Sequence, residues 1–334
     1  MLRERAGRVF QTALARAVAP LAVVLIAGAI FNANGAFFTW ETHRSMLREI
    51  SVHGILACGM TVVILTGGID LGVGSLLGLS AVGFAMLAMP MEVAAPLAIG
   101  AVLAGGAALG AVSGGFVARF RVQPFVVTLA MMVFGRGLAK LISGGQKITV
   151  YTSLSEVPDT TRELPAVMKA IDTKILGGNV SVVTVVFLAC AGVTWVVLRR
   201  LRVGRYIYAT GGSREAAELS GVPAGRTLVI AYALSGVMAA VAGICQAAQE
   251  THGDPETGFG YELDAIAMVV LGGTTLSGGR GGIGLTLLGA LTMGMLQKIL
   301  SLNAFQTAER MMLTGVILMV AVLFQRRLGS EGQR

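Results

Sequence analysis

The chain has 334 residues, of which 54% are hydrophobic and only 13% are charged. A water-soluble domain carries roughly a quarter charged residues, so this composition excludes an ordinary soluble protein. The net charge of +8 does not indicate nucleic-acid binding, because the basic residues stand in short links between apolar stretches rather than in one patch.

The apolar stretches predict membrane-spanning helices. Each has roughly the 17 to 25 residues that a helix needs to cross about 30 Å of hydrocarbon. They lack the two-residue alternation of a β-barrel strand. We therefore predict an all-α, polytopic membrane protein with about ten transmembrane helices. In chain order the predicted spans cover 14–38, 50–66, 72–89, 93–116, 123–143, 180–198, 227–249, 263–277, 283–300 and 311–325.

Two pairs of these spans, the second with the third and the eighth with the ninth, are joined by glycine-rich turns at 67–70 and 278–282. Eight spans with re-entrant elements satisfy the hydropathy nearly as well, so this alternative stays open. The first span is longer than the apolar region of a signal peptide and no clear cleavage site follows it, so we expect a retained helix.

The distribution of charge predicts an orientation. With the N-terminus inside, the arginines at 3–16, 119–121, 199–226 and 326–327 fall on the cytoplasmic side, and most acids fall on the other side. This is the positive-inside pattern. We expect both termini in the cytoplasm and one membrane domain over residues 1–334. The scattered cysteines and histidines indicate no disulfide frame and no metal site.

The inner link, residues 199–226, carries the signals of a short helix. Ser213 is a favourable N-cap, Glu215 and Glu218 suit the first turns, and Gly221 followed by Pro223 ends the helix. A helix this short is marginal in water and needs a partner. A solvated surface turn is the alternative interpretation. The chain contains no G-x-x-x-x-G-K-[ST] sequence, so it has no P-loop of its own.

Asp70 is the only acid well inside the apolar sequence. An intramembrane acid is costly and indicates function by default. The alternative is that Asp70 caps a helix that begins near Leu71. The two are compatible, because a broken helix can line a cavity. Near the outer surface, Arg136 and Lys140 can snorkel outward, or contact a partner molecule. Glu262 and Asp264 can also contact a partner or be solvated.

Six motifs together resemble the ribose-type ABC permeases, a monosaccharide family related to the branched-chain amino acid permeases. They are Gly-Gly-Ile-Asp-Leu-Gly-Val-Gly-Ser (67–75), Gln-Pro-Phe-Val-Val-Thr-Leu (123–129), Arg136-Gly137, Gly-Gly-Ser-Arg-Glu-Ala-Ala-Glu-Leu-Ser-Gly (211–221), Gly-Tyr-Glu-Leu-Asp-Ala-Ile-Ala (260–267) and Gly-Gly-Thr-Thr-Leu-Ser-Gly-Gly-Arg-Gly (272–281). They span about residues 50–325 in the family's order. The chain departs from the family pattern at Ser113, at Gly72 and in the acidic stretch 252–258.

The resemblance implies a fold like that of type II ABC importers, in the bacterial inner membrane. It implies a permease subunit that moves a monosaccharide or similar polyhydroxylated solute, driven by ATP hydrolysis in a separate ATP-binding cassette subunit. It also implies a second permease subunit, identical or not, and a periplasmic sugar-binding protein. The chain itself is then not an enzyme and binds no cofactor and no nucleic acid. Residues 213–221 become the coupling helix, with contacts to the ATPase from Ser213, Arg214, Glu215, Ala216, Ala217 and Glu218.

Within the matched motifs, the candidates for the translocation path are Gly68, Asp70, Ser75 and Thr128, and those for outer-face docking are Arg136, Glu262 and Asp264. The main alternative function is an ion-coupled secondary transporter with Asp70 as the proton or cation site. An intramembrane enzyme would need convergent His, Ser or carboxylate groups, for which a lone Asp70 is a poor start. A pentose, a hexose, inositol, a nucleoside or a furanose-like signal all remain open as the solute.

Overall fold

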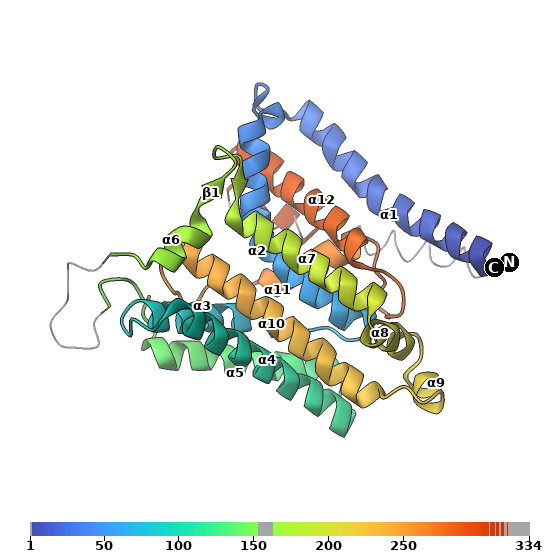
Figure 1. Ribbon diagram of the computed structural model, residues 1–334. Coiled ribbons are helices and arrows are strands. Elements are labelled where there is room, and N and C mark those ends of the chain that lie inside the picture. Colours follow the sequence, from blue (N-terminus) through green and yellow to red (C-terminus); the bar gives the residue numbers. More distant parts are fainter. Residues whose placement is uncertain are drawn as a thin grey trace.

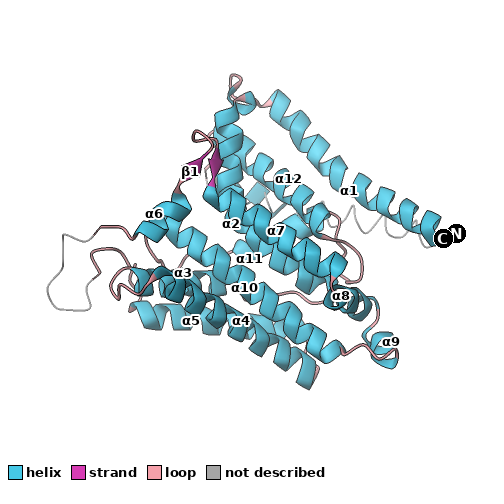
Figure 2. Cartoon of the chain, viewed as in Figure 1, coloured by secondary structure: helices cyan, strands magenta, loops and turns pink. Residues whose placement is uncertain are grey.

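The computed structural model describes residues 2–152 and 163–306, with short stretches at 308–310, 312–313, 315–316 and 319. These residues form an all-helical bundle with one small antiparallel ribbon of β1 (Lys174–Ile175) and β2 (Val180–Ser181) (Figures 1 and 2). The helices are α1 (Leu2–Ile30), η1 (Ala36–Phe38), α2 (Trp40–Leu65), α3 (Val73–Ala88), α4 (Ala95–Phe120), α5 (Pro124–Ser143), α6 (Ala166–Asp172), α7 (Val182–Arg200), α8 (Arg202–Gly212), α9 (Arg214–Leu219), α10 (Ala224–Glu250), α11 (Tyr261–Leu271) and α12 (Ile283–Leu302).

Six of these helices, α2, α4, α5, α7, α10 and α12, are long and apolar enough to cross a membrane. The predicted multi-pass helical class is therefore confirmed, whereas the count of about ten is not. The predicted span 263–277 is wrong as a continuous helix, because α11 ends at Leu271 and a glycine-rich loop follows. The 16 residues of α3 and the 11 of α11 rise only about 24 Å and about 16 Å, short of a full crossing.

Other predicted boundaries shift by a few residues or lie outside the description. The first predicted span, 14–38, is replaced by α1, which ends at Ile30, and by η1. Most of the tenth, 311–325, lies outside the described residues. Eight spans with re-entrant elements, and the cytoplasmic placement of both termini, stay predictions.

The centre of the bundle is α10, which packs on α2, α3 and α4. Its contact with α4 is made through glycines. A Cβ at Gly106 would lie 2.5 Å from the carbonyl oxygen of Gly236, and one at Gly110 would lie 2.2 Å from that of Tyr232. Gly105 and Gly115 instead face open space among the described residues. Only some of the glycines of α4 therefore serve close helix packing.

The two ends of the bundle differ in what they carry. At one end, here named the ribbon end, the ribbon lies beside the start of α2 and α6 packs on the end of α10 (Figure 1). Arg48 pairs with Asp172 there, and the Arg44 guanidinium donates to the Gly178 carbonyl over 3.1 Å. The opposite end carries α8 and α9 and is named the α9 end (Figure 1).

Candidate functional site

The segment between α2 and α3 is a buried break around Asp70, whose residue exposure is 2%. Asp70 Oδ1 accepts a hydrogen bond from the Gly72 backbone N–H over 3.0 Å. Asp70 Oδ2 accepts a second one from the Ser235 hydroxyl of α10 over 2.8 Å. The carboxylate thus turns the chain just ahead of α3 and ties this turn to the central helix. Asp70 therefore accepts a hydrogen bond from the N–H two residues on, as the predicted capping role requires. It is not the N-cap of α3, which is Gly72.

The other candidate path residues gather around the same turn. The Thr128 hydroxyl of α5 donates to the Ile69 carbonyl over 3.1 Å, and the Ser75 hydroxyl donates to the Gly72 carbonyl over 2.9 Å. At Gly68 a Cβ would lie 2.4 Å from the Tyr232 hydroxyl oxygen. The structure brings all four candidates together, with each side-chain polar group bonded to the loop. Their place in a translocation path stays a prediction.

Tyr232 is a site residue that the sequence motifs did not indicate. It lies on α10 three residues before Ser235 and is fully buried. Its hydroxyl has no hydrogen-bond partner among the described residues. A buried hydroxyl without a partner is unusual and costly. No signal in the apolar sequence of α10 distinguishes this tyrosine from an ordinary core residue.

Three glycine-rich motifs far apart in sequence meet at the α9 end. The Gly279 N–H donates to the Leu65 carbonyl over 3.0 Å. A Cβ at Gly211 would lie 1.9 Å from that same carbonyl oxygen, and one at Gly278 would lie 2.7 Å from the Gly67 nitrogen. We name Leu65, Gly67, Gly211, Gly278 and Gly279 the glycine junction. Sequence reasoning interpreted the turns at 67–70 and 278–282 separately and did not predict that they touch each other and the end of α8.

The short helix predicted at 213–221 is present as α9. The Ser213 hydroxyl accepts from the Ala216 N–H over 3.2 Å, which is the expected N-cap bond. Gly221 follows with a positive φ of 79°, as a helix stop requires. Because Ser213 follows Gly211 by two residues, α9 begins directly beside the glycine junction.

The two sides of α9 have different surroundings. Arg214 pairs with Glu218 over 2.9 Å and donates to the Ala118 carbonyl over 3.2 Å, which holds α9 against the end of α4. The hydrogen bond from Arg214 lowers the pKa of Glu218. Ala217 is buried, whereas Glu215 and Ala216 are exposed. Leu219 lies in the predicted helix but was not among the predicted ATPase contacts, and it is 90% exposed.

At the ribbon end, basic residues on and after α5 hold the link between α10 and α11. The Arg136 guanidinium donates to the carbonyls of Pro255 and Thr257. Lys140 pairs with Glu256 over 2.6 Å, and Lys147 pairs with Asp254 over 3.1 Å. We name these contacts the basic clasp. Arg136 and Lys140 therefore have partners within the chain, rather than only the snorkelling that was predicted.

The three outer-face candidates do not form one surface. Burial raises the pKa of Glu262, and backbone hydrogen bonds and the nearby charge of Arg136 only partly offset this. Asp264 lies two residues on and faces α2, where its Oδ2 is 3.6 Å from His53 Nε2. His53 is a further residue that sequence reasoning left without a role.

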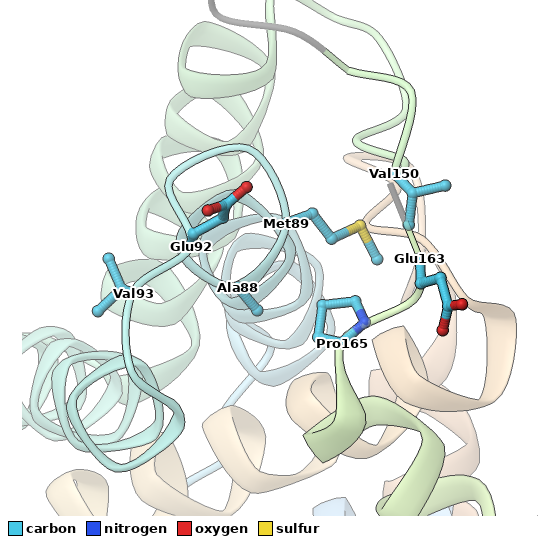
Figure 3. Close-up of a pocket in the computed structure, with 7 residues that line it drawn as sticks. All are labelled: Ala88, Met89, Glu92, Val93, Val150, Glu163 and Pro165. Carbon is cyan, nitrogen blue, oxygen red and sulfur yellow. The ribbon is translucent and has the colours of Figure 1, made fainter. Parts of the chain in front are cut away.

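A separate pocket of about 380 Å³ lies at the ribbon end, between the link after α3 and the link before α6. Figure 3 shows Glu92 and Glu163 at its edges, with Met89 and Pro165 between them. Glu163 is already paired with Lys169 over 2.8 Å. None of the predicted site residues lines this pocket, and it lies at the opposite end of α3 from Asp70.

Comparison with known proteins decides the family. The family model described as "Branched-chain amino acid transport system / permease component" matches residues 43–322. The ribose import permease of Escherichia coli (strain K12) is 39% identical over 307 residues, covering 92% of this chain and 92% of its own length. The chain is a ribose-type ABC permease.

Permeases named for other sugars are also similar. The fructose import permease of Bifidobacterium longum is 36% identical over 280 residues, covering 83% of this chain and 80% of its own length. The L-arabinose transport system permease of Escherichia coli (strain K12) is 33% identical over 307 residues, covering 91% of this chain and 88% of its own length. No solved structure matches the permease. The matched range 43–322 contains the glycine junction, α9 and the basic clasp.

Proposed function

We propose that the permease is the membrane subunit of a binding-protein-dependent ABC importer for a monosaccharide. The observation that carries this proposal is the near full-length similarity to a ribose import permease. A separate ATP-binding subunit supplies the energy, a periplasmic sugar-binding protein delivers the solute, and a second permease subunit completes the membrane part. The relatives are named for ribose, fructose and L-arabinose, so the solute class is a neutral monosaccharide.

In this proposal α9 is the coupling helix. Its outward side presents Glu215, Ala216 and the nearly fully exposed Leu219, while Arg214 and Glu218 brace it from behind. An exposed leucine on a braced helix suits insertion into an apolar groove of a partner. The α9 end is then the cytoplasmic end, which agrees with the arginines in the 199–226 link.

The glycine junction provides a route from α9 to the broken helices. Gly211 packs directly on the Leu65 carbonyl, and Leu65 ends the helix that leads into the Asp70 turn. A displacement of α8 and α9 by the ATPase therefore acts on the loops 66–72 and 272–282 without an intervening side chain. Backbone contacts of this kind have little freedom to absorb a movement.

The test is uptake by proteoliposomes that hold the permease with its ATP-binding subunit and its sugar-binding protein. We expect uptake of labelled monosaccharide that requires internal ATP. Glu215→Arg, Ala216→Asp and Leu219→Asp are each expected to lower uptake and ATPase stimulation at least about tenfold, as loss of a central contact does. Leu176→Asp, at a leucine of the ribbon end that is 73% exposed, is the matched control.

The alternative, an ion-coupled secondary transporter using Asp70, makes opposite predictions. Its uptake would continue without any ATP-binding subunit and would stop when an uncoupler removes the ion gradient. Uptake that is insensitive to the uncoupler and dependent on ATP rules this alternative out. Normal coupling in all three α9 variants would show that the coupling helix is assigned wrongly.

A further inference from the structure

Three polar side chains at the ribbon end form a cluster between α2 and α11. His53 lies on α2, and Tyr261 and Asp264 lie in the first turn of α11. The ring centroids of His53 and Tyr261 are 4.2 Å apart with a tilt of 35°. Asp264 Oδ2 lies 3.6 Å from His53 Nε2, which is beyond hydrogen-bonding distance. The carboxylate and the imidazole are therefore neighbours that do not satisfy each other.

The cluster contains hydrogen-bond donors and acceptors without partners, whereas other polar groups at this end are bonded. Among the described residues, no donor lies within hydrogen-bond distance of the Asp264 carboxylate, and neither the His53 Nδ1 nor the Tyr261 hydroxyl has a bonded partner. In contrast, Arg136 is bonded to the link carbonyls and Lys298 to Glu49. Unused donors and acceptors side by side point to a polar ligand.

The position of the cluster indicates what its exposed part faces. The side chains of His53 and Asp264 are 16% and 23% exposed, and His53 lies one helical turn further along α2 than Glu49. A carboxylate facing hydrocarbon is costly, so the exposed part of Asp264 faces water or another polar surface. The carboxylates of Glu250 and Asp264 both lie close enough to Tyr261 to place negative charge around it. This negative surrounding disfavours an anionic solute such as a sugar phosphate.

Resting on the proposed function, we propose that His53, Tyr261 and Asp264 contact the neutral sugar as it enters at the ribbon end. A carboxylate accepts hydrogen bonds from sugar hydroxyls, and an imidazole can donate or accept them. An aromatic ring packs against the C–H face of a sugar while its hydroxyl bonds at the edge. The cluster offers all three kinds of contact within two neighbouring helices.

The experiment uses the complete transporter in proteoliposomes, loaded with ATP and supplied with its binding protein and labelled ribose. Asp264→Asn is expected to lower uptake about tenfold, the size of one lost hydrogen bond to a charged group. Glu41→Gln, at an exposed acid of the same end, is expected to leave uptake unchanged. Uptake of ribose by Asp264→Asn within twofold of the unmodified complex would overturn the inference.

Two further variants separate sugar contact from a structural ion pair. The exchange of His53→Asp with Asp264→His keeps a carboxyl group and an imidazole side by side, so recovered uptake would show a structural role and overturn the inference. Tyr261→Phe keeps the ring and removes the hydroxyl. It is expected to reduce the preference for ribose over a deoxyribose, and an unchanged preference contradicts the contact. If the unmodified complex imports no monosaccharide, the proposed function fails; an active complex that is insensitive to these variants refutes only the cluster.

Discussion

The contacts that hold the α9 end of the permease together differ in kind from those within the ribbon end. At the α9 end, backbone meets backbone through the glycine junction, with no side chain between Gly211 and Leu65. At the ribbon end, the basic clasp joins α5 to the α10–α11 link through charged side chains. Backbone contacts at these glycines leave no room for a side chain between the segments. Ion pairs near the surface, in contrast, are weak and depend on salt. The first arrangement suits transmission of a movement, and the second suits a link that adjusts.

The largest effect is expected from a methyl group at the glycine junction. In Gly211→Ala the new Cβ would lie 1.9 Å from the Leu65 carbonyl oxygen, so α8 and α2 must separate. We expect the free energy of unfolding to fall by about 1–3 kcal/mol, measured by thermal unfolding in detergent. We also expect ATP-coupled uptake to be lost, measured by transport. Gly212→Ala is the control, because a Cβ there meets no described atom within 4 Å. Equal behaviour of the two variants would remove the junction as a coupling element.

A smaller effect is expected at the Asp70 turn. Asp70→Ala leaves the Gly72 N–H and the Ser235 hydroxyl without their acceptor, at about 1–3 kcal/mol. Asp70→Asn keeps the size and one carbonyl oxygen, so we expect a folded permease with uptake within several-fold of normal. Thermal unfolding and ATP-driven uptake measure both. Complete loss of uptake in a stable Asp70→Asn permease would instead indicate that the carboxylate carries charge.

The smallest effect is expected in the basic clasp. Lys147→Gln removes a partly exposed ion pair with Asp254, worth about 0.5 kcal/mol, and the difference is expected to shrink in high salt. Burial tends to raise the pKa of Asp254, but its hydrogen bonds from Glu256 and Lys147 outweigh this and lower it. A lowered pKa in the folded state gives stability that is present above the usual value of 3.8 and is lost as the pH falls below it. Unfolding curves at several salt concentrations and acidic pH values test this.

The contrast between the two ends also shows where sequence reasoning stopped. The helix at α9 was predictable, because Ser213, Gly221 and Pro223 act on their own neighbours and need no distant partner. The exposed Leu219 was not singled out, since exposure of one side of a short helix depends on what lies behind it. Similarly, the sequence places Arg136 and Lys140 one turn apart on the same helix, but their partners in the α10–α11 link come from over a hundred residues away.

The amino-acid sequence by itself determined the membrane class, the helical fold, the short helix after Ser213 and the family, because composition, hydropathy and contiguous motifs are local properties. The tertiary structure decided which apolar stretches are broken and what meets at the breaks. Hydropathy counts residues and cannot tell an 11-residue helix with a loop from a full span, so α11 was predicted too long. The meeting of Gly67, Gly211 and Gly279, and of His53 with Asp264, depends on how the helices pack, which no single segment encodes.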